Sequence, residues 1–214
     1  SYAKTSDGSK VRKKLQTVWN DKAFHTEKGQ AALEELLPGR IFQSPKPVGL
    51  IKNLISLCND KTSIVLDFFS GSGTTAQAVM EANSEDGGNR KFILSQLPES
   101  SGREDYPTIA HITRERVRRV IARLNRENDK KSDRGFRAFK LSSSNFRIWN
   151  ADKAPDEPAA LGEQLRLYAD NVERARGEQD VLYELILKSG LPLSSRVERI
   201  EIAGQLAWAV NDYK

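Results

Sequence analysis

The chain has 214 residues, of which 38% are hydrophobic and 29% charged, and this length predicts one domain or one domain with an appendage. No apolar run approaches the roughly 20 residues that span a bilayer, and the Lys-rich start lacks the apolar stretch of a secretory signal, so the sequence argues against a membrane or secreted protein. The single cysteine, Cys58, excludes a disulfide framework within the chain and a zinc site built from cysteines. We therefore expect a cytoplasmic protein.

The charge is distributed unevenly along the chain. Lysine and arginine number 34 against 29 acidic residues, for a formal net charge of +5. Residues 107–126 contain six arginines and one acid, Glu115, whereas residues 151–190 contain five bases and nine acids. Such a division favours different partners for the two parts. The arginines are typical of the solvated face of an amphipathic helix, and contact with phosphates is the alternative.

The first quarter of the chain predicts two short helices after a polar start. Residues 1–14 show no apolar periodicity and are expected to form a loose end. Residues 27–37 have a helical apolar face that ends at a Pro-Gly pair. Residues 41–47 are expected to be extended, because two prolines push the residue before each of them out of helical geometry. A second helix follows over residues 47–59.

The middle of the chain predicts a βαβ unit. Residues 63–69 (SIVLDFF) form a nearly continuous apolar run, which is typical of a strand buried on both faces of a parallel sheet. A glycine-rich turn, a helix over residues 74–82 and a second such strand over residues 91–97 follow. This order favours an α/β fold with a right-handed crossover. Residues 107–126 predict the next helix and residues 135–141 a third strand.

The composition changes after Trp149. Residues 152–158 are predicted to be a linker, residues 161–176 and 180–189 two helices, and residues 200–210 a β-hairpin.

These patterns divide the chain into three parts. A polar N-terminal segment with a short helix occupies residues 1–40, the main α/β part occupies residues 41–150, and a C-terminal extension with helices and a hairpin occupies residues 151–214.

The glycine-rich turn lies in residues 67–75 (DFFSGSGTT) and is the segment most informative about function. A glycine turn between a buried strand and a helix lets a ligand approach the backbone and aims helix N-terminal amides at a negative group. No Gly-Lys-Ser/Thr follows, which excludes a phosphate-binding P-loop, and Ala76 takes the third glycine position of a dinucleotide fingerprint. A ligand with an anionic or zwitterionic end and a ribose remains, with Asp67 placed for the ammonium of an amino acid. A tight structural turn is the alternative.

Two neighbouring segments of the chain resemble motifs of a known family of enzymes. DFFSGSGTT resembles the S-adenosylmethionine-binding motif of DNA methyltransferases that modify amino groups, and FQSPKPVGLIKNLI (42–55) is similar to the motif that precedes the glycine loop in their β group. Other segments resemble, in the right order, the adenine-specific modification subunit of type III restriction-modification systems. They are WN (19–20) with HTE (25–27), RKFILSQLPE (90–99), TIAHITRERVRRVI (108–121), DRGFRAFKLSSSNFRIW (133–149) and DVLYELILKSGLPLS (180–194).

The resemblance implies part of a Rossmann-like methyltransferase sheet, S-adenosylmethionine as the cofactor, and methyl transfer to the exocyclic amine of adenine in duplex DNA. By this resemblance residues 41–150 are the cofactor-binding part, Asp67 meets the methionine ammonium, and Gln96 stands where such folds usually carry an acid that binds the ribose hydroxyls. The implied cofactor-binding residues are Ser44, Lys46, Asp67, Phe68, Phe69, Ser70, Gly71, Ser72, Gly73, Thr74 and Gln96.

One expected motif is missing from the chain. Enzymes of this kind hold the flipped adenine with an Asp/Asn-Pro-Pro-Tyr/Phe tetrapeptide, and no adjacent prolines occur in this sequence. We therefore assign no catalytic residue and expect the C-terminal part of a longer protein, which also stops short at Lys214. The missing strands would leave an edge of the strand at residues 63–69 exposed. We expect no methylation by the isolated chain and weak cofactor binding.

The same resemblance implies duplex DNA, the restriction subunit of the same system and a second copy of the full-length subunit as partners, and no membrane. A subunit-assembly and nonspecific DNA-contacting module without cofactor turnover is the alternative, with the acidic residues 161–189 docking a partner. His25 and His111 are the only histidines, and they have no cysteine cluster or metal-ligand spacing beside them, so we expect no metal site.

Overall fold

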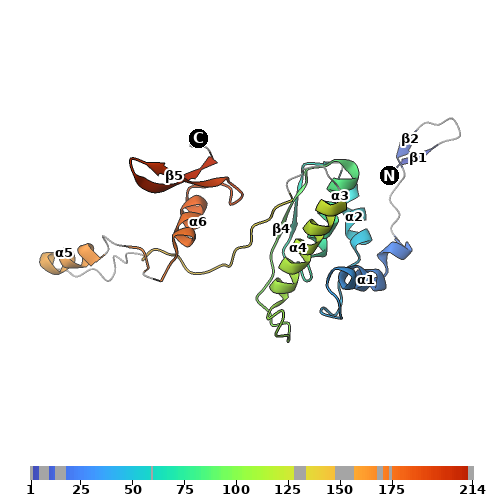
Figure 1. Ribbon diagram of the computed structural model, residues 1–214, viewed down its shortest axis with the longest axis horizontal. Helices are drawn as coiled ribbons and strands as arrows, with labels where there is room; N and C mark the ends of the chain where they lie inside the picture. The colour runs from blue at the N-terminus through green and yellow to red at the C-terminus, as the bar shows by residue number, and fades with distance from the viewer. Residues whose placement is uncertain are drawn as a thin grey trace. The chain divides into compact units, whose positions relative to one another are not determined.

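The computed structural model describes residues 2–4, 10–12, 18–58, 60–127, 134–147, 157–167, 171–173 and 175–211, the first two ranges as backbone only. The chain divides into two compact units, Ser1–Phe136 and Arg137–Lys214, both shown in Figure 1. The predicted linker at residues 152–158 lies almost entirely outside the described residues.

The first unit is built around the predicted βαβ unit. Strand β3 (Ile64–Asp67) leads through the glycine-rich turn into helix α3 (Thr74–Asp86), and strand β4 (Lys91–Leu94) returns beside β3. The two strands pair in parallel, with Ile64 opposite Lys91. The prediction of a parallel pair joined by a helix is therefore confirmed, with strands shorter than expected.

The two faces of the β3–β4 sheet differ in burial. Val65 and Phe92 point inward and pack against buried residues of α2 and α3. The alternate residues face outward, and Ile64, Leu66 and Ile93 are 62%, 59% and 53% exposed. The expectation that the first strand is buried on both faces is wrong for this chain, because helices cover only one face of the pair in the described residues. The apolar run at residues 63–69 therefore places apolar side chains on the exposed face as well as on the buried one.

Four helices surround the inner face of the sheet. They are α1 (Thr26–Leu36), α2 (Val48–Leu57), α3 and α4 (Ile109–Glu127), with a short 3₁₀ turn η1 (Lys22–Phe24) before α1. Helices α3 and α4 lie side by side next to β4 (Figure 1). The main core cluster comprises Leu33, Leu36, Leu37, Ile41, Ala76, Met80, Ile112, Val117, Val120 and Leu124. The helices at 26–36, 48–57 and 109–127 confirm the periodicity predictions.

Helix α1 packs unusually closely on the extended segment that precedes α2. A Cβ at Gly29 would lie 2.1 Å from the carbonyl oxygen of Pro45, which is buried. Only glycine therefore permits this approach of the helix to the segment at 41–47. The segment is not helical, as its prolines predicted.

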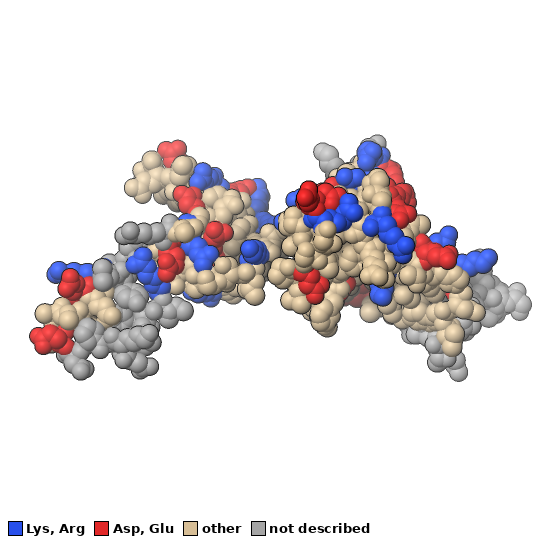
Figure 2. Space-filling view, turned by 90° about the horizontal axis from the view of Figure 1, so that it is seen from below, with Lys and Arg blue, Asp and Glu red and all other residues tan. Residues whose placement is uncertain are grey.

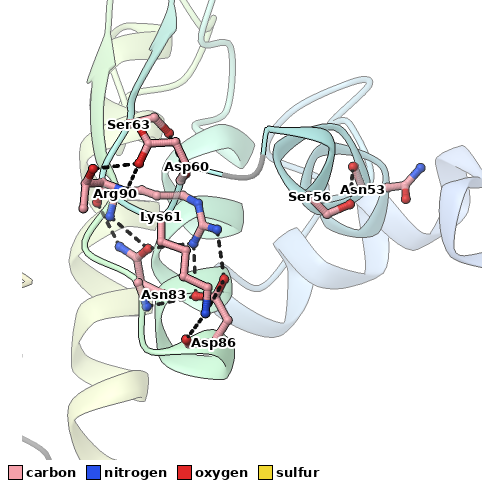
Figure 3. Close-up of polar contacts among 10 residues, drawn as sticks. Asn53, Ser56, Asp60, Lys61, Ser63, Asn83, Asp86 and Arg90 are labelled. Carbon is pink, nitrogen blue, oxygen red and sulfur yellow. Dashed lines mark hydrogen bonds and ion pairs between the residues drawn. The ribbon is translucent and has the colours of Figure 1, made fainter. Parts of the chain in front are cut away.

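A group of polar side chains closes the turn between α3 and β4 (Figure 3). The buried guanidinium of Arg90 donates to both carboxylate oxygens of Asp86, at 3.1 and 2.9 Å. The side chain of Asn83 accepts from the Arg90 amide at 3.1 Å and donates to the Arg90 carbonyl oxygen at 2.8 Å. Lys61 reaches the Asp86 carbonyl oxygen at 2.7 Å. These contacts hold α3 to the amino-terminal end of the sheet.

Two sequence predictions for local structure are wrong. The described parts of the expected loose end at residues 1–14 are ordered, because β1 (Tyr2–Lys4) pairs antiparallel with β2 (Lys10–Arg12). Residues 135–141 form no strand. Alternating side chains favour a strand only if a partner supplies backbone hydrogen bonds, and no described strand pairs with that segment.

The second unit contains α5 (Pro158–Leu167), α6 (Glu178–Lys188) and a hairpin of β5 (Val197–Ile202) and β6 (Gln205–Val210). The hairpin and the helix at 180–189 confirm the predictions. The predicted helix at 161–176 is shorter, since Val172 forms a bridge with Phe146 instead. Ala203 and Gly204 at the hairpin turn have φ of 51° and 78°, as a two-residue type I′ turn requires.

One carboxylate joins residues 144–145, which are neither helix nor strand, to helix α6. Glu184 on α6 accepts from the Ser144 hydroxyl at 2.5 Å, from the Asn145 amide at 2.6 Å and from Lys188 at 2.8 Å. These donors lower the pKa of Glu184 to about 2, with Lys188 contributing most.

Candidate functional site

The glycine-rich turn follows the carboxyl end of β3 and takes a left-handed backbone conformation at two glycines. Gly71 and Gly73 have φ of 50° and 80°, in the left-handed region where other residues are disfavoured. The Gly73 amide donates to the Ser70 carbonyl oxygen at 2.8 Å. A Cβ at Gly73 would lie 3.0 Å from the methyl carbon of Thr113 on α4. The turn is therefore pressed between the sheet edge and α4.

Asp67 is the last residue of β3 and lies at the entrance of the turn. Its carboxylate accepts from the Phe69 amide at 3.1 Å through Oδ1 and from the Thr75 hydroxyl at 2.5 Å through Oδ2. The side chain is half-buried. Each carboxylate oxygen can accept more than one hydrogen bond, so the group retains capacity for a further donor such as an ammonium.

Gln96 lies beyond β4 and holds the turn from the neighbouring strand. Its side-chain oxygen accepts from the Gly71 amide at 2.8 Å. The backbone adds two bonds between the same segments, from Ser70 to the Ser95 carbonyl oxygen at 3.1 Å and from Ser95 to the Asp67 carbonyl oxygen at 2.8 Å. The structure thus brings Gln96 to the glycine-rich turn and gives it a direct contact with the turn backbone.

Aromatic and hydroxyl groups complete the turn. The rings of Phe68 and Phe69 are 5.2 Å apart and the two residues are 63% and 74% exposed. Phe42 lies against Gly71, since a Cβ there would be 3.3 Å from its ring. The hydroxyl of Ser70 is buried and has no hydrogen-bond partner among the described residues. Two open rings beside a half-buried carboxylate offer stacking and ionic contacts to a ligand.

The two predicted residues upstream of α2 are placed differently from one another. The Lys46 carbonyl oxygen accepts from the Thr74 hydroxyl at 3.2 Å, so its backbone touches the start of α3 while its side chain is exposed. Ser44 is exposed, and among the described residues no hydrogen bond joins it to the glycine-rich turn.

Sequence reasoning missed the contribution of α4 to this region. The Thr113 hydroxyl donates to the Gly71 carbonyl oxygen at 2.6 Å. Arg116, one of the six arginines at 107–126, is fully buried and donates to Ser72, Thr74 and Gln77. Burial lowers the pKa of Arg116 to about 10, so it stays charged at neutral pH. The available signal was its spacing, four residues from both Ile112 and Val120 on the apolar face.

The remaining arginines of α4 are largely engaged with acids. Arg119 donates to Glu115 at 2.8 Å, and Arg123 forms an ion pair with Glu81 of α3. On the face shown in Figure 2, basic side chains are interspersed with acidic ones. These pairs favour the solvated-face interpretation of the arginine run.

The described ranges contain neither a candidate membrane span nor a candidate metal cluster. No helix there is long and apolar enough to cross a membrane. No three histidine, cysteine or acidic side chains in those ranges gather where they could share a metal ion.

The parallel βαβ unit, with a glycine-rich turn at the carboxyl end of its first strand, defines an α/β protein of the kind that binds ligands at that edge of the sheet. The comparison with known families then gives the assignment. The family model described as DNA methylase matches residues 2–112, just over half of the chain. The chain belongs to this DNA methylase family.

Individual relatives agree with this family assignment. The chain is 40% identical over 132 residues to the type III restriction-modification enzyme StyLTI Mod subunit of Salmonella typhimurium, covering 58% of this chain and 20% of that protein. It is 31% identical over 183 residues to the EcoP15I Mod subunit of Escherichia coli, covering 82% and 26%. It is 39% identical over 95 residues to the type II methyltransferase M.KpnI of Klebsiella pneumoniae, covering 44% and 23%. The chain spans about a quarter of these relatives' length or less.

Proposed function

We propose that the chain is the S-adenosylmethionine-binding part of an adenine-specific DNA methyltransferase of a type III restriction-modification system. The observation that carries the proposal is the arrangement at the sheet edge. The half-buried carboxylate of Asp67 and the open rings of Phe68 and Phe69 flank a turn whose backbone is held by Gln96. These groups match a ligand that has an ammonium, a flat base and a ribose. When bound, S-adenosylmethionine would supply the methyl group.

Each residue has a defined role in this proposal. Asp67 accepts a hydrogen bond from the methionine ammonium, while its bonds to Phe69 and Thr75 fix the direction of the carboxylate. The rings of Phe68 and Phe69 contact the nucleoside. The glycine-rich turn (Ser70, Gly71, Ser72, Gly73 and Thr74) lines the cofactor, and Ser44 and Lys46 approach its carboxylate end.

Gln96 would act in two ways. Its oxygen holds the Gly71 amide at 2.8 Å, and its side-chain nitrogen, which lies 3.4 Å from the Leu97 carbonyl oxygen, can turn to a ribose hydroxyl. An amide offers such a hydroxyl a neutral hydrogen bond, weaker than the charge-assisted bond of a carboxylate. We therefore expect cofactor affinity to depend on Gln96 less than on Asp67.

The exposed outer face of the β3–β4 sheet supports the proposal that the chain is part of a larger enzyme. Ile64, Leu66 and Ile93 form an apolar surface of the kind that usually marks a contact site. We propose that the remainder of the methyltransferase covers this face and supplies the adenine-binding tetrapeptide, so the isolated chain binds cofactor weakly and transfers no methyl group. The whole enzyme would act in the cytoplasm on duplex DNA, as a dimer, together with a restriction subunit. Methyl transfer from labelled cofactor by this chain alone would overturn the claim of inactivity.

The cofactor assignment is tested by titrating the ¹⁵N-labelled chain with S-adenosylhomocysteine and following amide resonances. We expect shifts confined to residues 67–75 and 96, and no saturable shift with Asp67→Asn. Asp60→Asn is the matched control, because Asp60 also accepts from the amide two residues on, that of Thr62, and from a threonine hydroxyl. Binding unaffected by Asp67→Asn, or shifts located elsewhere, would refute the assignment.

The same exposed face favours the second candidate, an assembly module without cofactor turnover. Stable self-association of the chain without any response to S-adenosylhomocysteine would support this candidate over the first.

A further inference from the structure

Arg116 is a buried cation that forms no ion pair with any carboxylate of the described residues. Its side chain is 0% exposed, yet its hydrogen bonds all go to neutral groups. Nε donates to the Gln77 side-chain oxygen at 2.9 Å, and one terminal nitrogen donates to the hydroxyls of Ser72 and Thr74, each at 2.9 Å, with the Ser72 carbonyl oxygen at 3.5 Å. The other terminal nitrogen has no partner among the described residues.

This position is unfavourable for a positive charge on two grounds. Removing a guanidinium from water is unfavourable unless an opposite charge compensates. The group also lies at the amino end of α3, where the helix dipole repels cations. Burial without an ion pair therefore contributes little to stability by itself, and what Arg116 gains is three hydrogen bonds of 2.9 Å directed at one short stretch of chain.

That stretch includes the glycine-rich turn. Arg116 reaches Ser72 and Thr74 on the two sides of Gly73, while Thr113, one helical turn earlier on α4, donates to the Gly71 carbonyl oxygen. Two glycines with positive φ give the turn little conformational preference of its own. Its shape therefore depends on the hydrogen bonds from α4, in addition to those that it makes with β3 and Gln96.

We propose that Arg116 is a positioning residue that holds the glycine-rich turn in its ligand-binding shape before any ligand arrives. The inference rests on the proposed function for the identity of that ligand, the methyl donor. A turn ordered in advance loses less conformational entropy on binding, which raises affinity without a direct contact. Arg116 itself is shielded from solvent and does not touch the ligand.

The other end of α3 offers a matched control. Arg90 is also a buried arginine, 7% exposed, and it fixes the α3–β4 turn through Asp86. Loss of either arginine should lower stability, but only Arg116 contacts the glycine-rich turn. Arg116→Met, Arg116→Lys and Arg90→Met therefore separate positioning from general destabilisation.

Amide hydrogen exchange of the full chain without ligand is the primary measurement. Arg116→Met should speed exchange at Gly71, Gly73 and Thr75 by about tenfold or more relative to the α4 amides, as loss of charge-assisted bonds predicts. Arg116→Lys should restore part of the protection, because an ammonium can reach one or two of the same oxygens. Arg90→Met should leave these amides unchanged relative to α4.

Two results would overturn the positioning role. One is unchanged exchange in the turn of the Arg116→Met variant, and the other is an equal increase at the turn in Arg90→Met. Affinity for S-adenosylhomocysteine is measured in parallel and should fall about tenfold or more in Arg116→Met if the turn is the binding site. If the wild-type chain does not bind this probe while turn exchange responds as expected, the proposed function fails and the positioning role stands.

Discussion

The Thr75 hydroxyl donates a 2.5 Å hydrogen bond to the Asp67 carboxylate across the glycine-rich turn. The bond links the last residue of β3 to the first turn of α3, eight positions later. It therefore joins the two ends of the turn and fixes the orientation of the Asp67 carboxylate, which we propose accepts a hydrogen bond from an ammonium group.

Replacing Thr75 should test this closure. Thr75→Val keeps the shape of a side chain that is 6% exposed and removes the donor. We expect the free energy of unfolding to fall by about 1 to 2 kcal/mol, since a partly buried bond to a charged group is lost. Denaturant unfolding measures the change. Thr62→Val, which removes an exposed bond to Asp60, should change the free energy of unfolding by less than about 0.5 kcal/mol. Equal losses in both variants would show that the Thr75–Asp67 bond does not stabilise the turn.

The contact between Asp86 and Arg90 predicts a pH dependence of stability. Hydrogen bonds from Arg90 hold the pKa of Asp86 below its usual value of 3.8. Because the folded-state pKa is depressed, the stabilisation is complete above pH 3.8 and is lost as the pH falls through the lower folded-state value. Asp86→Asn should be less stable than wild type at pH 6 and approach it at low pH. A difference that stays constant from pH 6 to about 2 would exclude this origin.

Glu184 should produce a similar dependence in the second unit. Its pKa is lowered from 4.5 to about 2 by Lys188, Ser144 and the Asn145 amide. Protection of the Asn145 amide against hydrogen exchange should therefore persist above pH 4.5 and weaken as the pH falls toward 2. Glu184→Gln should lose that protection at neutral pH. The control variant Glu163→Gln, an exposed change on α5, should retain the protection of the Asn145 amide. Equal protection in Glu184→Gln and wild type would show that Glu184 does not fix residues 144–145.

The two faces of β3 should respond differently to the same chemical change. Val65→Thr puts a hydroxyl against the inner core cluster and should cost about 1 to 2 kcal/mol. Ile64→Thr alters a side chain that is already 62% exposed and should cost less than about 0.5 kcal/mol. Unfolding at several protein concentrations measures both. Equal losses that grow with concentration would show that the outer face is covered by self-association.

Gly29 should reverse the usual preference of helices for alanine. Glycine inside a helix is about 1 kcal/mol less favourable than alanine. A Cβ at Gly29 would, however, meet the Pro45 carbonyl oxygen at 2.1 Å, whereas one at Gly162 of α5 would meet nothing within 4 Å. Gly29→Ala should therefore lower the melting temperature and Gly162→Ala should not. A stabilising Gly29→Ala would show that α1 and the segment at 41–47 separate readily.

Local patterns predicted most of the regular structure. The helices at 26–36, 48–57 and 74–86 and the hairpin at 197–210 follow from side-chain period, glycines and prolines within a few residues of each element. The strand predicted at 135–141 failed because a strand also needs a partner, which its own residues do not supply.

The sequence by itself determined the βαβ unit and the turn at Ser70–Gly73, because both depend on residues adjacent in the chain. Only the tertiary structure decided which arginine of α4 is buried and where it donates. Arg116 lies 44 positions from Ser72 and 39 from Gln77, so no local pattern brings them together. Packing of α4 against α3 turned one member of a seemingly solvated charge run into the support beneath the turn, because burial is a property of the assembled helices.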